Sequence, residues 1–232
     1  PAILGDRVIT GAMVLDRTHN HMPSGVVRAY NVRSGALEWY WDPIPPGQKP
    51  EIDAMGKPVY RRGTTNVWSL ISVDPERKLV FLPTGNTSTD FFGGLRDNMD
   101  YFSSSVVALK GDTGELAWHF QMVHHDIWDY DTPAQPTLFE FERDGKTIPA
   151  LAQPTKMGHL FILHRETGEP LFPVEERPVP QDWEVPGEYL APTQPFPVLP
   201  APLVPQRLRP EDAWGLTPWD RNRCRDQISR LR

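Results

Sequence analysis

This chain of 232 residues has little of several features that mark other classes of protein. It contains one cysteine, Cys224, which excludes an internal disulfide and says nothing about the cellular compartment. No apolar run approaches the ~18 residues of a membrane span, and no signal peptide is visible. The formal net charge is −6, and basic residues gather only near the C-terminus, which argues against nucleic acid as a partner.

A helical period is also missing, except near the C-terminus, and turn residues are abundant instead. The 26 prolines and 17 glycines indicate many turns, while a hydrophobic content of 39% is enough for a packed core. Short runs rich in β-branched and aromatic residues lie between these turns, as is typical of strands. We therefore predict an all-β fold with strands at residues 25–30, 78–83, 104–109 and 158–163.

One motif repeats along the chain. Residues 29–39 (AYNVRSGALEW) return as residues 108–118 (ALKGDTGELAW), and residues 162–172 (ILHRETGEPLF) form a weaker third copy. In each copy a glycine supplies the positive φ of a tight turn, and a large aromatic four residues later can dock onto the neighbouring unit. Short strands with one such motif per unit favour a β-propeller over a sandwich.

Composition divides the chain into three parts. Residues 1–173 carry the strands and the repeat and are predicted to form propeller blades in a partial ring. The proline-rich segment, residues 174–210, is expected to be an excursion or linker over the surface. Residues 211–232 are expected to start a further segment. Neither end resembles a natural terminus, so we interpret the chain as a piece of a longer protein.

The densest group of titratable and aromatic side chains is HHDIWDYD, residues 124–131, which we call, together with the following TPAQP, the acidic segment (residues 124–136). Such a group is costly to pack without a purpose, although a polar loop with turn-capping aspartates explains it equally well from composition alone. On an extended segment Asp131 would share a face with Asp129, and Asp126 would not, and we expect both to be supporting groups. His124 and His125 would point to opposite faces, and one of them could orient or contact a substrate.

These motifs resemble a known family. The repeat resembles the tryptophan-docking motif of quinoprotein dehydrogenases, eight-bladed propellers that bind pyrroloquinoline quinone (PQQ). The acidic segment resembles the catalytic segment of the membrane-bound branch that contains glucose, quinate and shikimate dehydrogenases. Residues 154–159 (PTKMGH) resemble the lysine segment of that branch. The resemblance runs over nearly the whole chain and implies further blades and an N-terminal membrane segment outside it.

The resemblance also implies roles for single residues. Asp129 matches the general base that takes the hydroxyl proton as hydride leaves the substrate carbon. Lys156 matches the cation that contacts the quinone oxygens and supports charge developing there. Trp68 matches the floor of the PQQ site, because a planar tricyclic cofactor needs a flat ring on which to stack. The ordinary alternatives are a turn-capping aspartate, an exposed lysine and a core tryptophan.

Two residues are expected to bind a divalent metal. The turn at residues 83–88 (PTGNTS) offers the amide oxygen of Asn86, which suits Ca²⁺ or Mg²⁺ and can also contact the cofactor. The alternative is an ordinary Gly-Asn turn without a metal. Asp16 falls where the branch carries a second metal-site acid, although Arg17 stands where that branch tends to have asparagine.

Taken together, the resemblance implies a fragment of a PQQ-dependent dehydrogenase that oxidises an alcohol group of a sugar or cyclic polyol. Glucose is the favoured substrate, with quinate or shikimate as the alternative. A divalent metal would polarise the quinone, and electrons would pass to ubiquinone at the periplasmic face of the inner membrane. The rival interpretation is a non-catalytic propeller scaffold, which would have no reason to keep the four matched residues Trp68, Asn86, Asp129 and Lys156.

Overall fold

The structure is a computed structural model that describes residues 1–15, 17, 21–48, 51–52, 54–55, 58–59, 63–96 and 98–231. Its elements, in chain order, are β1 (Ala2–Leu4), β2 (Arg7–Thr10), β3 (Val27–Asn31), β4 (Leu37–Trp41), β5 (Glu51–Ile52), β6 (Pro58–Val59), β7 (Ser72–Asp74), β8 (Leu79–Pro83), η1 (Met99–Phe102), β9 (Ser105–Lys110), β10 (Leu116–Gln121), β11 (Thr137–Arg143), β12 (Lys146–Pro154), β13 (Leu160–His164), β14 (Val174–Pro178), β15 (Thr193–Pro197), η2 (Pro210–Asp212) and α1 (Pro218–Ile228).

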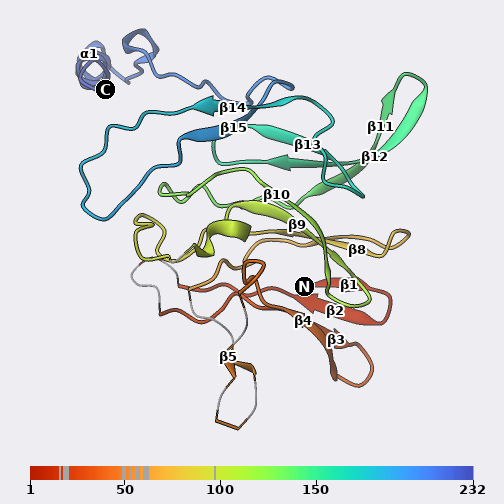
Figure 1. Cartoon of the computed structure of the whole chain (residues 1–232). Helices are drawn as coiled ribbons and strands as arrows, with labels where there is room; N and C mark the ends of the chain where they lie inside the picture. Colours follow the sequence, from red (N-terminus) through yellow and green to blue (C-terminus); the bar gives the residue numbers. More distant parts are fainter. Residues whose placement is uncertain are drawn as a thin grey trace.

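The strands form antiparallel sheets that follow one another in chain order (Figure 1). Two of them are four-stranded blades, with the orders β1-β2-β3-β4 and β10-β9-β8-β7, and the next is the three-stranded sheet β11-β12-β13. Two-stranded sheets β14-β15 and β5-β6 complete the described set. The prediction of an all-β, partial propeller is confirmed, and the four predicted strands correspond to β3, β8, β9 and β13.

The middle blade is buried on both faces, which explains the nearly unbroken apolar run of its strand β8. Val80 and Leu82 belong to the core shared with the first blade, whereas Leu79 and Phe81 belong to the core shared with the third sheet. A strand that is half exposed shows alternating apolar and polar residues, but a strand between two cores does not. Burial on both sides therefore holds three consecutive sheets together.

The repeated motif joins each blade to the next. The indole Nε1 of Trp39 donates to the carbonyl of Gly111 at 2.9 Å, and its ring lies over Gly114 in the turn of the second blade. A Cβ on Gly114 would stand 2.5 Å from that ring, so the close approach requires glycine. Trp118 lies over Gly168 of the third sheet in the same way. Both glycines have positive φ, as the repeat predicts.

The third copy of the motif ends differently. Phe172 packs edge-on against Phe141 of β11, with ring centroids 5.6 Å apart, and the guanidinium of Arg143 lies 4.8 Å from its ring centre. The aromatic of this copy thus contacts its own sheet among the residues that the structure describes.

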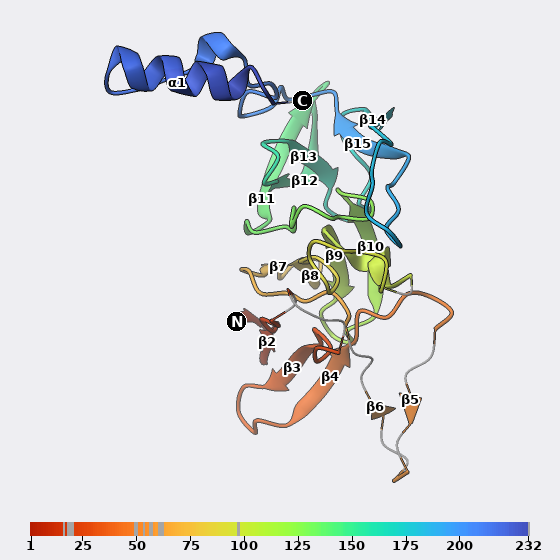
Figure 2. The same ribbon diagram turned by 90° about the vertical axis from the view of Figure 1, so that its left-hand side faces the viewer.

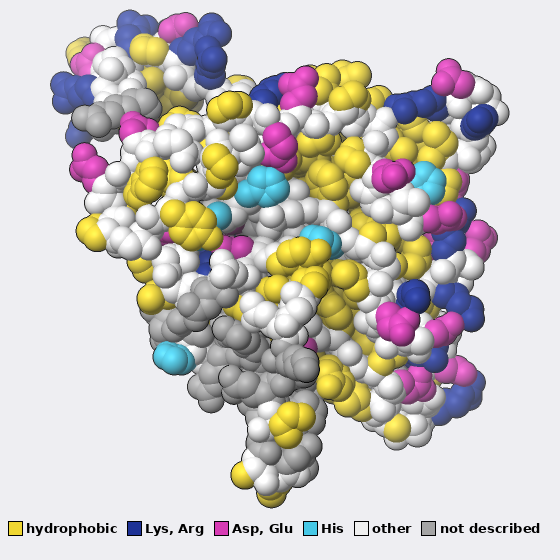
Figure 3. All heavy atoms as spheres, viewed as in Figure 1, with side chains coloured by type: hydrophobic (Ala, Val, Ile, Leu, Met, Phe, Trp, Pro, Cys, Tyr) yellow, Lys and Arg dark blue, Asp and Glu magenta, His cyan; other side chains and the backbone are white. Residues whose placement is uncertain are grey.

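The two ends of the sheets differ in character. Short turns of the repeat lie at one end, and the longer loops 84–104, 122–136 and 179–192 gather at the other (Figure 1). Charged side chains of both signs line the edge of the face in Figure 3, where histidine and hydrophobic side chains occupy the middle. Surface pairs such as Arg7–Asp112 and Lys78–Asp112 connect the short turns. The long-loop end is therefore the place for a functional site.

The proline-rich segment contains the hairpin β14-β15, in which Val174 pairs with Pro197. Beyond it, the chain continues to α1, which projects away from the sheets (Figure 2). Thr217 caps this helix by accepting a hydrogen bond from the backbone N–H of Asp220, and Pro218 occupies its first turn. Among the described residues, no helix is long and apolar enough to cross a bilayer.

Candidate active site

Lys156 lies between two aspartates of the acidic segment. Its Nζ donates to the backbone carbonyl of Asp129 at 2.6 Å, lies 3.4 Å from the Asp129 carboxylate and forms an ion pair with the carboxylate of Asp131. The other oxygen of Asp131 accepts the indole N–H of Trp68 at 2.7 Å. Four side chains from three separate parts of the chain thus meet at one point.

The electrostatics of this point favour a charged lysine. Burial lowers the pKa of Lys156, but the hydrogen bond and charge of Asp131, together with the charge of Asp129, outweigh burial and raise that pKa. Lys156 is therefore positively charged at neutral pH, and the carboxylates of Asp129 and Asp131 both lie beside its ammonium group.

Local backbone geometry places these groups. Lys156 stands in a tight turn after β12, which Gly158 closes with a positive φ and an N–H donated to the Thr155 carbonyl at 3.0 Å. Asp129 itself has a φ of 57°, so the acidic segment bends at this residue and is not extended. Gly85 leaves room for the indole of Trp68, since a Cβ there would lie 3.2 Å from the ring.

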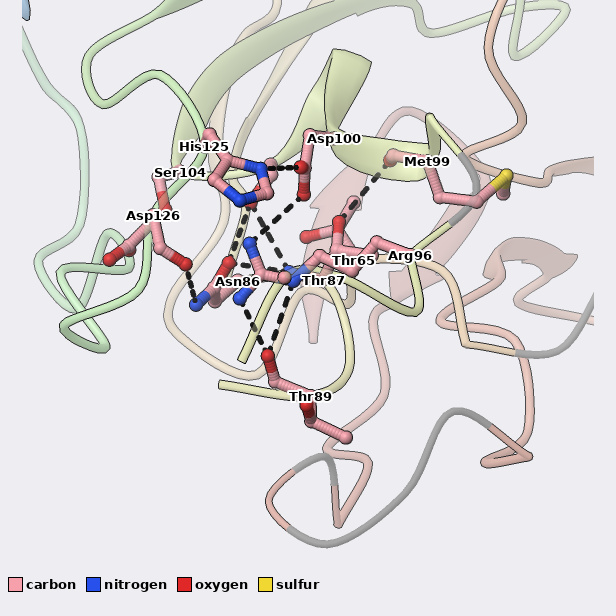
Figure 4. Close-up of polar contacts among 12 residues, drawn as sticks. Thr65, Asn86, Thr87, Thr89, Arg96, Met99, Asp100, Ser104, His125 and Asp126 are labelled. Carbon is pink, nitrogen blue, oxygen red and sulfur yellow. Dashed lines mark hydrogen bonds and ion pairs between the residues drawn. The ribbon is translucent and has the colours of Figure 1, made fainter. Parts of the chain in front are cut away.

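Asp131 has a larger part in the site than the sequence indicated. It was expected only as a supporting group, yet it joins Trp68 to Lys156. Asp126 instead faces the interior, where its carboxylate accepts hydrogen bonds from Ser104 Oγ and from the backbone N–H of Trp128 (Figure 4). Burial raises the pKa of Asp126 in spite of these hydrogen bonds. The sequence feature that pointed to Asp131 was its position two residues after Asp129.

Asn86 is buried and fully hydrogen-bonded (Figure 4). Its Nδ2 donates to the carbonyls of Asp90 and Asp126, at 3.0 and 2.8 Å. Its Oδ1 accepts from the backbone N–H of Thr87 at 2.8 Å and from Ser103 Oγ at 3.0 Å. Two donors and two lone pairs are all that an amide side chain has. Asn86 therefore ties its loop to the acidic segment in this structure.

The expected metal ligands are not assembled by the described part of the chain. The Oδ1 of Asn86 already accepts two hydrogen bonds, and Asp16 lies outside the described residues. Within the described ranges, no three His, Cys, Asp or Glu side chains are grouped as ligands of a metal ion. Asn86 therefore has no free oxygen lone pair for a metal in this arrangement, and the assignment of Asn86 and Asp16 as metal ligands stays a prediction.

The two histidines point to different partners, as expected of adjacent residues. His124 contacts Gln121 and Glu176 through its two ring nitrogens, at 2.7 and 3.0 Å. His125 is buried between Asp100 and Glu188, at 2.7 and 2.8 Å. Both histidines therefore join the acidic segment to the proline-rich segment.

A cavity of about 740 Å³ lies between these two segments. Trp128, Tyr130 and Lys156 line it on one side, and Trp183 and Leu190 of the proline-rich segment on the other. Sequence reasoning did not foresee that the proline-rich segment forms this wall, because its composition shows no sign of what it packs against.

The family model described as "PQQ: Glucose/ethanol/alcohol dehydrogenase, beta-propeller domain" matches residues 1–232. The β-propeller domain in this description agrees with the partial propeller that the described sheets form. The chain belongs to the PQQ-dependent dehydrogenase propeller family.

Curated relatives agree with this membership. The glycerol dehydrogenase large subunit of Gluconobacter thailandicus is 42% identical over 99% of this chain and 31% of its own length. The quinate/shikimate dehydrogenase (quinone) of Acinetobacter baylyi is 39% identical over 100% of the chain and 29% of its own length. The quinoprotein glucose dehydrogenase of Escherichia coli is 38% identical, with the same two shares. The chain thus spans about three-tenths of the length of these relatives.

A solved structure is similar as well. The quinohemoprotein alcohol dehydrogenase ADHIIG of Pseudomonas putida HK5 superimposes with a TM-score of 0.61 and 28% identity, over 78% of this chain and 28% of the other. This likeness supports the partial propeller independently of the sequence matches.

The residues around Lys156 fit PQQ. The indole of Trp68 is 41% exposed, and its N–H is fixed by Asp131, so a ring face remains open for stacking. Beside this face, the ammonium of Lys156 suits the oxygens of an anionic quinone.

Proposed function

We propose that the full-length protein is a PQQ-dependent dehydrogenase that oxidises an alcohol group of a sugar or polyol. The observation that carries this proposal is the meeting of Asp129, Asp131, Lys156 and Trp68. A scaffold that used the repeat only for assembly would need no half-exposed tryptophan beside a lysine and two carboxylates. The membership of the chain in the family adds support.

Each residue has a distinct task in this proposal. PQQ, when bound, supplies the acceptor for the hydride that leaves the substrate carbon. Trp68 binds the cofactor plane by stacking, and Lys156 binds its oxygens. Asp129 accepts the proton of the substrate hydroxyl at its carboxylate. Lys156 also donates to the Asp129 carbonyl at 2.6 Å, which holds this base at the bend of the acidic segment.

The substrate, metal, electron acceptor and location are finer parts of the proposal. We favour glucose, with quinate or shikimate as the alternative, and relatives named for glycerol, quinate/shikimate and glucose support a polyol or sugar. We further propose Ca²⁺ or Mg²⁺ as the metal and ubiquinone as the electron acceptor. The enzyme would lie at the periplasmic face of the inner membrane, attached through a segment outside this chain.

The test is a substrate panel on the full-length protein with PQQ and Ca²⁺, comparing the parent with Asp129→Asn. Asparagine keeps the size of the side chain but cannot accept the proton, so turnover should fall by about 10²–10⁴-fold while PQQ binding changes little. Asp144→Asn is the matched control, because Asp144 lies in the turn between β11 and β12 with a φ of 51° that asparagine tolerates.

Two results would count against the proposal. Near-parental turnover of Asp129→Asn would remove the base from the acidic segment. No change in absorbance when PQQ and Ca²⁺ are added to the parent would instead favour the non-catalytic scaffold.

A further inference from the structure

A row of polar and charged side chains runs from loop 84–104 to the proline-rich segment, and Figure 4 shows its first three members, Arg96, Asp100 and His125. Arg96, 2% exposed, lies 3.3 Å from one carboxylate oxygen of Asp100. The other oxygen of Asp100 is 2.7 Å from Nδ1 of His125. The Nε2 of His125 is 2.8 Å from the carboxylate of Glu188. We call Asp100, His125 and Glu188 the latch.

The latch places a carboxylate at each ring nitrogen of His125. Nδ1 lies within hydrogen-bond distance of Asp100, and Nε2 lies within hydrogen-bond distance of Glu188. Burial opposes ionisation of Glu188, but hydrogen bonds from His125, Gly93 and Tyr189 outweigh burial and lower its pKa. Arg96 adds a positive charge beside Asp100 at the other end of the latch.

Further contacts hold the three residues of the latch in position. The second oxygen of Glu188 accepts the backbone N–H of Gly93 at 2.6 Å. A Cβ on Gly93 would lie 2.1 Å from the His125 ring, so this loop passes the imidazole closely only because it has glycine there. The ring of Tyr189 stacks on His125 with centroids 3.6 Å apart. Three loops are thus joined at one buried imidazole.

The loop that carries Glu188, residues 179–192, otherwise has few anchors. It connects β14 to β15 and is mostly exposed. Trp183 and Leu190 of this loop line the cavity that Lys156 also lines. Glu188 therefore holds the wall of this cavity to the acidic segment.

We propose that His125 is a positioning residue whose ring, through its hydrogen bond to Glu188, fixes residues 179–192 as the substrate-side wall of the cavity beside Lys156. This inference rests on the proposed function for the identity of the substrate as an alcohol. Asp129 is held separately, since Lys156 donates a hydrogen bond to its backbone carbonyl. Asp126 anchors the same segment through Ser104 and Asn86. Loss of the latch should therefore weaken substrate binding and leave the proton transfer largely intact.

The experiment compares Glu188→Gln, His125→Gln and the double variant in the full-length protein with PQQ and Ca²⁺. Glu184→Gln is the matched control, because it removes the same charge from an exposed position of the same loop. The measurements are amide hydrogen exchange of residues 179–192, PQQ binding, and KM and kcat for the alcohol that the parent oxidises best.

A hydrogen bond to a charged group supports exchange protection and KM effects of about 10- to 100-fold. We expect exchange of residues 179–192 to accelerate and KM to rise by this factor in both single variants, with kcat within about threefold of the parent. The double variant should be no worse than His125→Gln alone, since that variant already removes the contact with Glu188. PQQ binding and the Glu184→Gln control should stay at parental values.

Unchanged exchange in Glu188→Gln would overturn the latch, and this variant decides the question even if His125→Gln does not fold. Faster exchange with an unchanged KM would overturn the role of the loop as a substrate wall. A parent that oxidises no alcohol of the panel would overturn the proposed function and the substrate wall with it, while hydrogen exchange would still report on the latch.

Discussion

Trp68 offers two separable features to a quinone site, a ring face and an indole N–H. The N–H is bonded to Asp131 at 2.7 Å, and the ring is 41% exposed. Trp68→Phe removes the hydrogen bond and keeps an aromatic face, whereas Trp68→Ala removes both. If stacking holds the cofactor, Trp68→Ala should weaken PQQ binding at least about tenfold, and Trp68→Phe clearly less.

Fluorescence or absorbance titration of the full-length protein with PQQ measures this difference, and a thermal melt of each variant reports the effect on folding. Equal PQQ affinity of the parent and Trp68→Ala, together with a lower melting temperature, would make Trp68 a core residue only.

At the scale of residues, the sequence indicated which side chains come together in the site but not which hydrogen bonds they form there. Asp129, Lys156 and Trp68 were all named, and they lie together. Asp131 was underrated because its two partners, Trp68 and Lys156, lie in distant parts of the chain. No sequence pattern announces the bend at Asp129, where φ is 57°. The hydrogen bonds of Asn86 depend on loops far apart in the chain, which no local motif encodes.

At the scale of elements, the tryptophan-docked turns make a direct prediction. Gly35 and Gly114 have φ values of 70° and 74°, but a Cβ would meet nothing within 4 Å at Gly35 and would stand 2.5 Å from the Trp39 ring at Gly114. Gly35→Ala should cost only the left-handed backbone penalty, about 1–2 kcal/mol. Gly114→Ala should cost about 1–3 kcal/mol more, because the ring has to move.

Urea denaturation of the two variants of the full-length protein measures the difference. Equal loss of stability in both would mean that the docking of Trp39 onto Gly114 is not tight.

A buried ion pair joins the second blade to the third sheet. Asp74 at the end of β7 lies 2.9 Å from Arg165, which follows β13, and both side chains are less than a tenth exposed. Burial raises the pKa of Asp74, but hydrogen bonds from the Arg77 backbone, Arg165 and the Arg77 side chain outweigh burial and lower it. A lowered folded pKa means that this stabilisation is complete above the ordinary value of 3.8 and is lost as pH falls through the folded value.

Asp74→Asn should therefore lower the free energy of unfolding by about 3 kcal/mol at pH 7, since it removes the buried carboxylate that faces Arg165 and leaves the half-exposed Glu140 as its ion-pair partner. As the pH falls from 3.8 through the lower folded pKa of Asp74, the parent and the variant should converge. Denaturant curves of the full-length protein at pH 7 and at acid pH test this, with Asp112→Asn in an exposed ion pair as the control of small effect. A constant difference at all pH values would contradict the assignment.

The sequence predicted some strands and missed others. Strands β3, β8, β9 and β13 were found because apolar runs between turn residues reflect burial within a blade. The hairpin β14-β15 was not found, because prolines lie in both of its strands and argue against a strand within a sheet. This hairpin stands alone as a two-stranded sheet, where few ladder hydrogen bonds are needed.

At the scale of the whole molecule, the chain forms part of a ring. A propeller protects its sheets by closing on itself, and a partial ring leaves faces that would otherwise be covered. The described part of the chain exposes large apolar side chains on α1 and just before it, including Trp214 at 73%, Leu216 at 86% and Trp219 at 79%. Helix α1 projects away from the sheets, so these side chains have little of the chain to pack against (Figure 2).

We therefore expect the isolated 232 residues to associate in solution and to show no turnover when PQQ and metal are added. Size-exclusion chromatography with light scattering measures the association. Replacing Trp214 and Trp219 together by serine should reduce it, because an apolar patch of two large rings is removed. Val185→Ser, which removes one exposed apolar side chain from the proline-rich segment, should change it little. A monomeric parent chain would show that the exposed apolar side chains do not cause association. Dehydrogenase turnover by the isolated chain would show that these blades form a working site without further blades.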